Sequence, residues 1–141
     1  MTEQAQGIIP HLMVDGAADA IAFYTKAFGA TEVVRLPAED GKRLMHAELS
    51  VNGSRLFLMD DFPEYREQCS AGTIVNPKAG GVTTAVMHLF VPNCDEAVKR
   101  ATDAGATLLM APADMFWGDR YGQVLDPFGH AWSFAHPLNK A

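Results

Sequence analysis

The chain has 141 residues, and 48% of them are hydrophobic, which suffices for one folded domain with its own core. Seventeen acidic and eleven basic residues give a net charge of −6, and no cluster of Lys and Arg exceeds a pair. This balance argues against polyanionic partners, so we predict no nucleic-acid and no membrane contact and expect a small-molecule ligand. The N-terminal segment shows no leader pattern, and the isolated Cys69 and Cys94 suit a reducing compartment, so we expect a cytoplasmic protein.

An internal repeat organises the chain. The segment 14–21, VDGAADAI, matches the segment 91–98, VPNCDEAV, and the Gly-Ala-Thr at 29–31 recurs at 105–107. The offsets are 77 (91 − 14) and 76 (105 − 29), so a single deleted residue reconciles them. We therefore predict a single domain over 1–141, with one module at about 7–60, a linker at about 61–83 and a second module at about 84–137.

The first module is predicted to contain a strand at 8–14, a helix at 17–28 and strands at 31–37, 44–51 and 54–59. In the helix, Ile21, Tyr24 and Phe28 form one apolar stripe, and Gly29 provides the stop. The linker, rich in Pro and Gly, reads as a long connection of the kind that is often functional.

The second module repeats this order, with a strand at 84–91, a helix at 94–104 and strands at 107–111, 120–125 and 130–135. Asn93 and Glu96 have the spacing of a capping box at the start of the helix. The pattern is βαβββ twice, which predicts an α+β fold. The segment Asp126–Gly129 is expected to form a tight turn before the last strand.

Alternation within the strands selects candidate site residues. In the strand 44–51, Met45, Ala47, Leu49 and Val51 are predicted to face the helix, which leaves His46 and Glu48 on the opposite, concave face. His11 and His88 lie on the first strand of each module, at the repeat offset. They could be hydrogen-bonded histidines of a polar cavity, metal ligands, or contacts to an organic ligand.

The segment 116–122, FWGDRYG, gathers Trp117, Arg120 and Tyr121 next to two glycines. The planar fork of Arg and the aromatic rings suit an anionic or aromatic ligand. Alternatively, the rings seal one end of a barrel, and Asp119 pairs with Arg120 or a neighbour. The acidic residues at the start of the linker, Asp60, Asp61 and Glu64, are expected to form a solvated edge.

Three segments carry a family resemblance: 8–33 (IIPHLMVDGAADAIAFYTKAFGATEV), 44–61 (LMHAELSVNGSRLFLMDD) and 116–137 (FWGDRYGQVLDPFGHAWSFAHP). They resemble the glyoxalase, bleomycin-resistance and extradiol-dioxygenase group, the vicinal oxygen chelate superfamily, and within it the PhnB-like, demethylubiquinone methyltransferase-like branch. The resemblance implies two modules that form a cupped, incompletely closed mixed β-barrel with helices outside. It also implies a homodimer whose modules pair within or between chains.

In metal-dependent members of the group, His and Glu ligands come from the first and last strands of both modules. The matching positions here are Ile9, Val86, Phe57 and Ser133, a set that departs from that pattern. We therefore predict a small-molecule-binding protein with no cofactor and no assigned catalytic residue. Its expected ligand-binding residues are His11, His46, Glu48, His88, Trp117, Arg120 and Tyr121.

Two alternatives remain open at this point. In one, His11, His88 and either His46 or Glu48 hold a divalent metal in a lyase, isomerase or dioxygenase. In the other, the protein sequesters a cationic drug by aromatic stacking within an acidic surface and leaves it intact.

Overall fold

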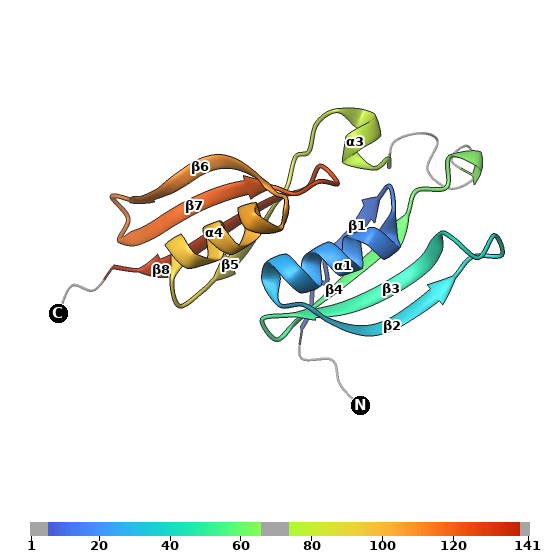
Figure 1. Ribbon diagram of the computed structural model, residues 1–141, viewed down its shortest axis with the longest axis horizontal. Coiled ribbons are helices and arrows are strands. Elements are labelled where there is room, and N and C mark those ends of the chain that lie inside the picture. Colours follow the sequence, from blue (N-terminus) through green and yellow to red (C-terminus); the bar gives the residue numbers. More distant parts are fainter. Residues whose placement is uncertain (1–5, 66–73, 139–141) are drawn as a thin grey trace.

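The computed structural model describes residues 6–65 and 74–138 and divides them into two modules that lie side by side (Figure 1). The first module consists of β1 (His11–Val14), α1 (Ala17–Phe28), β2 (Thr31–Pro37), β3 (Leu44–Val51) and β4 (Ser54–Asp60). The second consists of β5 (Val86–Phe90), α4 (Cys94–Ala104), β6 (Thr107–Asp114), β7 (Asp119–Leu125) and β8 (Ala131–Pro137). The connection carries a short 3-10 turn, η1 (Pro63–Tyr65), and a short helix, α3 (Pro77–Gly80).

Each module contains one four-stranded mixed sheet. The strand orders are β1-β4-β3-β2 in the first sheet and β5-β8-β7-β6 in the second, and only the pairs β1–β4 and β5–β8 are parallel. The sheets do not close into a barrel. The predicted α+β fold, with two βαβββ modules, is confirmed. No helix in the described ranges has the length and hydropathy that crossing a membrane requires.

The N-terminus of helix α1 is stabilised by a carboxylate that is distant in the sequence. Its N-cap residue, Gly16, has no side chain to offer, and the Asp60 carboxylate at the end of β4 accepts from the N–H groups of Gly16 (2.8 Å) and Ala17 (2.9 Å). A third donor is the N–H of Leu44, at 2.7 Å. Asp60 is only 3% exposed and Asp61 only 7%, so the predicted solvated edge is wrong for both. These positions are buried because the backbone N–H groups there need acceptors.

Helix α4 has a local cap, as predicted, because Asn93 Oδ1 accepts from the N–H of Glu96 at 3.1 Å. In addition, His136 Nδ1 on β8 accepts from the N–H of Cys94 at 2.8 Å. Cys94 itself is buried, with its Sγ 3.3 Å from the carbonyl oxygen of Phe134. Cys69 lies outside the described residues.

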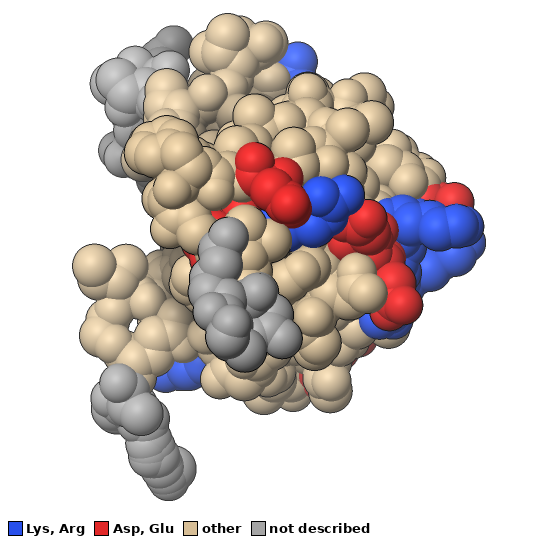
Figure 2. All heavy atoms as spheres, turned by 90° about the vertical axis from the view of Figure 1, so that its left-hand side faces the viewer, with Lys and Arg blue, Asp and Glu red and all other residues tan. Residues whose placement is uncertain are grey.

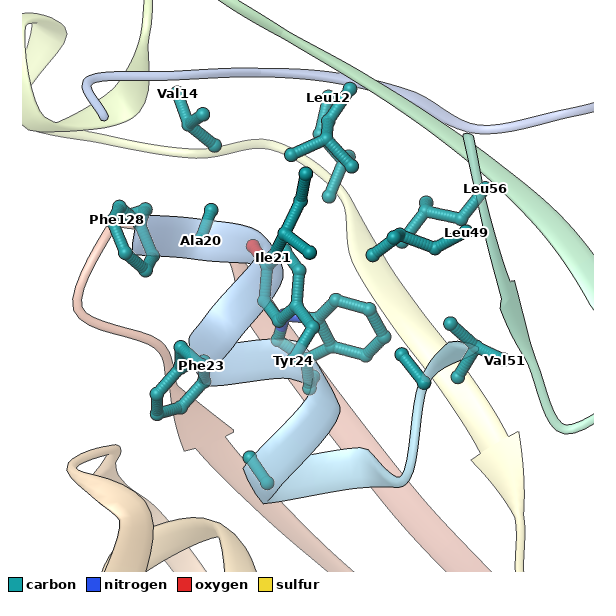
Figure 3. Packing of buried hydrophobic residues seen from close by; sticks show 14 of the residues in the cluster. Leu12, Val14, Ala20, Ile21, Phe23, Tyr24, Leu49, Val51, Leu56 and Phe128 are labelled. Atoms are coloured by element: carbon teal, nitrogen blue, oxygen red, sulfur yellow. The ribbon is translucent and has the colours of Figure 1, made fainter. Parts of the chain in front are cut away.

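The helix-covered faces of both sheets meet in one shared core (Figure 3). Phe28 of α1 packs on Trp132 of β8 with ring centroids 4.3 Å apart, and the hydroxyl of Tyr24 donates to Asp126 Oδ2 at 2.5 Å. His130 Nε2 lies 2.8 Å from the carbonyl oxygen of Met13 on β1. The opposite face of each sheet, here called its open face, therefore points away from this core.

The predicted turn before β8 is confirmed, and Asp126 organises it. Its Oδ1 accepts from the N–H groups of Phe128 (2.8 Å) and His130 (2.9 Å), and its Oδ2 also accepts from Trp132 Nε1 (2.9 Å). Gly129 has a φ of 91°, and an added Cβ there would meet the Cβ of Pro77 at 2.7 Å. Glycine is therefore required at this position.

One prediction of side-chain orientation is wrong. Met45 is 61% exposed and points away from the helix, whereas Leu44 is 3% exposed and faces it. The register between β2 and β3 shifts between Leu36 and Pro37, so Met45 is the extra residue of a β-bulge and the alternation restarts after it. Ala47, Leu49 and Val51 face the helix as predicted. The first strand begins only at His11, and β6 extends to Asp114.

Candidate functional site

The open face of the first sheet holds three rings in mutual contact. His11 of β1 pairs in register with Phe57 of β4. The centroids of the His11 and Phe57 rings are 5.7 Å apart, those of His46 and Phe57 are 4.7 Å apart, and those of His11 and His46 are 6.1 Å apart. The pKa of His11 is lowered, first by partial burial and then by the neighbouring His46, which favours a neutral ring at neutral pH. His11 and His46 thus lie close together on this face.

Glu48 lies on the same face but is already paired. Arg55 Nε donates to its Oε2 at 2.9 Å and Arg55 Nη2 to its Oε1 at 3.3 Å. The hydrogen bond from Arg55 lowers the pKa of Glu48, and the guanidinium also lies 5.3 Å from the centroid of the Phe57 ring. Glu48 is therefore a fixed carboxylate rather than a free base.

A pocket of about 1030 Å³ opens beside β1 and β4. Its walls come from the open face of the first sheet, the β2–β3 hairpin and the segment after β4; we call it the β1–β4 pocket. Most of its described lining is apolar, and its polar groups lie mainly on the hairpin and η1. The lining residues are His11, Met13, Ala38, Glu39, Asp40, Arg43, Met45, Met59, Asp61, Phe62, Glu64, Tyr65 and Ile74.

Arg43 holds one side of this pocket together. Its Nε donates to Asp40 Oδ2 at 2.7 Å, and its Nη2 and Nη1 donate to the two oxygens of Glu64 at 2.7 and 3.1 Å. The guanidinium carbon lies 4.3 Å from the centroid of the Phe62 ring. The hairpin and η1 are thereby joined. A hydrogen bond also joins the two ends of the connection between the modules, because Asn76 Nδ2 donates to Asp61 Oδ2 at 2.7 Å.

The open face of the second sheet carries the counterpart histidine. His88 of β5 pairs in register with Ser133 of β8, and His88 Nδ1 lies 2.7 Å from Ser133 Oγ. The His88 ring stacks on Tyr121 with centroids 5.9 Å apart and an interplanar angle of 16°. Gln123 Nε2 donates to the Tyr121 hydroxyl at 2.9 Å.

These two rings belong to a continuous series of five, which we call the ring row: Phe90, His88, Tyr121, Trp117 and Phe116. Neighbouring centroids are 4.7 to 5.9 Å apart. Phe116 is 97% exposed and Trp117 is 51% exposed, so most of the row is accessible. Figure 2 shows the end of the molecule that includes β6, where charged side chains form a band and most of the remaining described surface is uncharged.

Arg120 does not share the open face with Tyr121. Its side chain turns to the helix-covered side of β7, where Nε and Nη2 donate to Asp95 of α4 and Nη1 donates to Asp114 of β6 at 2.9 Å. The hydrogen bond from Arg120 lowers the pKa of Asp95. The planar fork of Arg120 is therefore engaged by carboxylates.

The predicted site residues thus form two groups within one chain. His11, His46 and Glu48 lie on the open face of the first sheet, and His88, Tyr121 and Trp117 lie on that of the second or at its end. Because both helix-covered faces contribute to one core, a single chain does not bring the two groups into one cavity.

The residues at the metal positions that the resemblance implies do not suit a metal ion. Phe57 offers only a ring, Ile9 and Val86 are aliphatic, and the hydroxyl of Ser133 is bonded to His88. Over residues 6–65 and 74–138, no group of three or more His, Cys, Asp or Glu side chains is arranged to hold a metal. Divalent metals need several such donors together.

Comparison with known proteins identifies the family. A family model described as the Glyoxalase/Bleomycin resistance protein/Dioxygenase superfamily matches residues 8–134. The chain belongs to this superfamily. It is 48% identical over 131 residues to an uncharacterized protein of Mycobacterium tuberculosis, a match that covers 93% of this chain and 74% of that protein. An uncharacterized protein of Arabidopsis thaliana is 32% identical over 83% of this chain and 69% of its own length.

Solved structures share the fold. TioX from Micromonospora sp. ML1 superimposes with a TM-score of 0.70 and 27% identity, over 95% of this chain and 100% of that one. A glyoxalase-related enzyme from Fulvimarina pelagi gives a TM-score of 0.72 at 21% identity, over 94% and 88% of the two chains, which shows a common fold alone.

Several lining residues of the β1–β4 pocket are absent from the sequence prediction. Met13 and Met59 could have been found, because they alternate with buried residues in their strands and must face the open side. Met45 could not, because the bulge breaks the alternation. Phe62 and Tyr65 lie in the connection, where no periodic signal exists.

Proposed function

We propose that this protein binds a small organic molecule in the β1–β4 pocket and that the ring row of a second copy of the chain completes the site. The observation that carries the proposal is the pocket itself, whose 1030 Å³ is close to the upper end of the range of about 300–1,000 Å³ for ligand sites. A mainly apolar wall with a few polar groups is typical of such sites.

The dimer is supported by the apolar surface that one chain leaves exposed. Trp117, Phe116 and Phe90 of the ring row are all exposed, as are Leu36 and Met45 near the pocket. Monomeric proteins rarely expose contiguous apolar patches of more than a few hundred Å². Pairing the first sheet of each copy with the second sheet of the other would cover both surfaces in a closed twofold dimer.

Within the superfamily, we assign the chain to the PhnB-like branch on the motifs FWGDRYG at 116–122 and DPFGHAW at 126–132. The side chains at the family's metal positions favour ligand binding without a metal. A displaced site remains the rival, because His11 and His46 are neighbours and His88 would come from the second copy.

The two tryptophans of the chain provide a matched test. We expect Trp117→Ala to abolish most of the affinity for an aromatic binder found by ligand-observed NMR and to leave the melting temperature nearly unchanged, because Trp117 lies outside the shared core of the two modules. The control, Trp132→Ala, removes a side chain that is 2% exposed and should cost about 3–5 kcal/mol of stability. Equal losses of affinity and stability in Trp117→Ala would contradict the proposal.

Elemental analysis separates the rival from the leading proposal. Protein incubated with zinc, nickel, iron(II) and manganese should retain no stoichiometric metal after dialysis. If wild type retains near-stoichiometric metal and the His11→Gln variant does not, a metal-dependent lyase, isomerase or dioxygenase would be favoured instead. Recovery of the aromatic binder unchanged after incubation with the protein would favour sequestration over catalysis.

A further inference from the structure

We infer that the ligand of the β1–β4 pocket is a planar aromatic cation rather than a carboxylate or phosphate compound. This inference rests on the proposed function, because it specifies the chemical class that the same pocket selects. Three features of the described lining support it: the pairing of its arginine, its surplus of carboxylates and its polarisable walls.

The one arginine among the described lining residues is not available to an anion. All three guanidinium nitrogens of Arg43 donate to the carboxylates of Asp40 and Glu64. On the neighbouring sheet surface, Arg55 is held by Glu48 in the same two-pronged way. An incoming carboxylate would have to displace an internal carboxylate to reach either fork.

The Arg43 contact also shows which chemistry this wall accepts. A planar, delocalised cation already lies 4.3 Å from the centroid of the Phe62 ring, with carboxylates at its edge. Aromatic faces attract cations because the ring quadrupole places negative charge on the face. The lining offers a second ring, Tyr65, and a further carboxylate, Glu39, to a flat cationic ligand.

The described lining holds more carboxylates than basic side chains. Hydrogen bonds from the backbone of Lys42 and from Arg43 lower the pKa of Asp40 to about 2, and the bond from Arg43 lowers that of Glu64. Glu39 adds a further carboxylate to the described lining. The lowered pKa of His11 favours its neutral form, so this ring adds little positive charge.

The apolar part of the wall consists largely of polarisable groups. Met13, Met45 and Met59 contribute thioethers, and Phe62 and Tyr65 contribute rings. Thioethers adapt their shape to flat aromatic ligands and contact them favourably. In the proposed dimer, the ring row of the second copy would add a further aromatic wall.

The test compares three flat two-ring probes by isothermal titration calorimetry: N-methylquinolinium as the cation, quinoline as the neutral compound and 1-naphthoate as the anion. We expect the cation to bind at least about fivefold more tightly than the anion, with quinoline between them. An anion that binds as tightly as the cation, or a cation that does not bind, overturns the inference.

Variants locate the effect in the pocket. Glu39→Gln should weaken the binding of N-methylquinolinium about threefold and leave quinoline unchanged, and the control Glu96→Gln on α4 should alter neither. Met45→Ala should weaken the cation and the neutral probe alike, because it removes contact area from an exposed position and leaves the core intact.

The outcomes separate this inference from the proposed function. If Met45→Ala weakens binding but 1-naphthoate binds best, the pocket is the site and the ligand class is wrong. If probes bind and Met45→Ala changes none of their affinities, the pocket is not the site, and the proposed function fails together with the inference.

Discussion

Helices α1 and α4 occupy equivalent places in the two modules, yet different residues stabilise their N-termini. Helix α4 has a cap within its own sequence, Asn93, and a second acceptor in His136. Helix α1 begins at a glycine and depends on Asp60, 44 residues away along the chain. Asp60 and His136 are themselves equivalent under the repeat (136 − 60 = 76), so the same position serves both helices with different chemistry.

The open faces differ in the same way. His11 and His88 are equivalent, but His11 borders a pocket with methionine and carboxylate walls, whereas His88 stands in a row of exposed rings. The two modules therefore share the same order of strands and helix but differ in the side chains on their open faces. In this protein, the open face of the first module borders a pocket, and that of the second carries exposed rings.

The largest expected effect comes from breaking the link between the modules. Asp126→Ala leaves four buried donors without their acceptor, among them the Tyr24 hydroxyl and Trp132 Nε1, so we expect a loss of about 4 kcal/mol of unfolding free energy in urea titrations. Its repeat equivalent, Ser50→Ala, is the control and should change stability little. Similar losses in both variants would show that Asp126 has no special role.

A medium effect is expected at the helix starts. Asp60→Ala removes the acceptor of three backbone N–H groups and should cost about 3 kcal/mol, because the carboxylate is buried. Asn93→Ala removes one exposed capping bond and should cost about 1 kcal/mol. If thermal unfolding shows that the second substitution costs as much as the first, the proposed difference between the two helices is absent.

The smallest effect concerns the pH dependence of stability that His11 causes. The pKa of His11 is lowered in the folded protein, so the unfolded chain binds the extra proton more readily. The contribution of His11 to the free energy of unfolding is fully present above its ordinary pKa of 6.5. It is lost as the pH falls from 6.5 toward the lowered pKa of His11 in the folded protein. Wild type should therefore lose slightly more stability between about pH 7.5 and about pH 5.5 than His11→Gln. Urea titrations at both values measure this, and a variant with the same pH dependence as wild type would contradict it.

The order of the helices and strands could be predicted from the sequence, because it depends on local signals. The start of α4, the ends of both helices, the Asp126–Gly129 turn and the alternation after Met45 are all encoded by neighbouring residues. The acceptor role of Asp60 and the pairing of Arg120 with Asp95 join residues distant in the chain, and no local pattern announces them.

The candidate site was accessible to sequence reasoning only in part. The repeat and strand alternation selected His11, His46 and His88 as candidates, and the aromatic motif selected Trp117 and Tyr121. The walls formed by Met45 and Phe62 depend on a bulge and on an irregular connection, which have no period. That the two groups of residues lie on separate faces follows from how both helices pack into one core, which only the structure reveals.

The central claim is that the pocket of one chain and the ring row of another form one site, and a mixed dimer tests it most directly. Chains carrying Met45→Ala and chains carrying Trp117→Ala are each expected to bind N-methylquinolinium poorly. A doubly tagged heterodimer purified from their mixture should regain one full-affinity site, because one of its two sites combines an intact pocket with an intact ring row. A heterodimer that binds N-methylquinolinium no better than either parent variant would contradict this claim. So would the finding that the wild-type protein and both variants are all monomeric in solution.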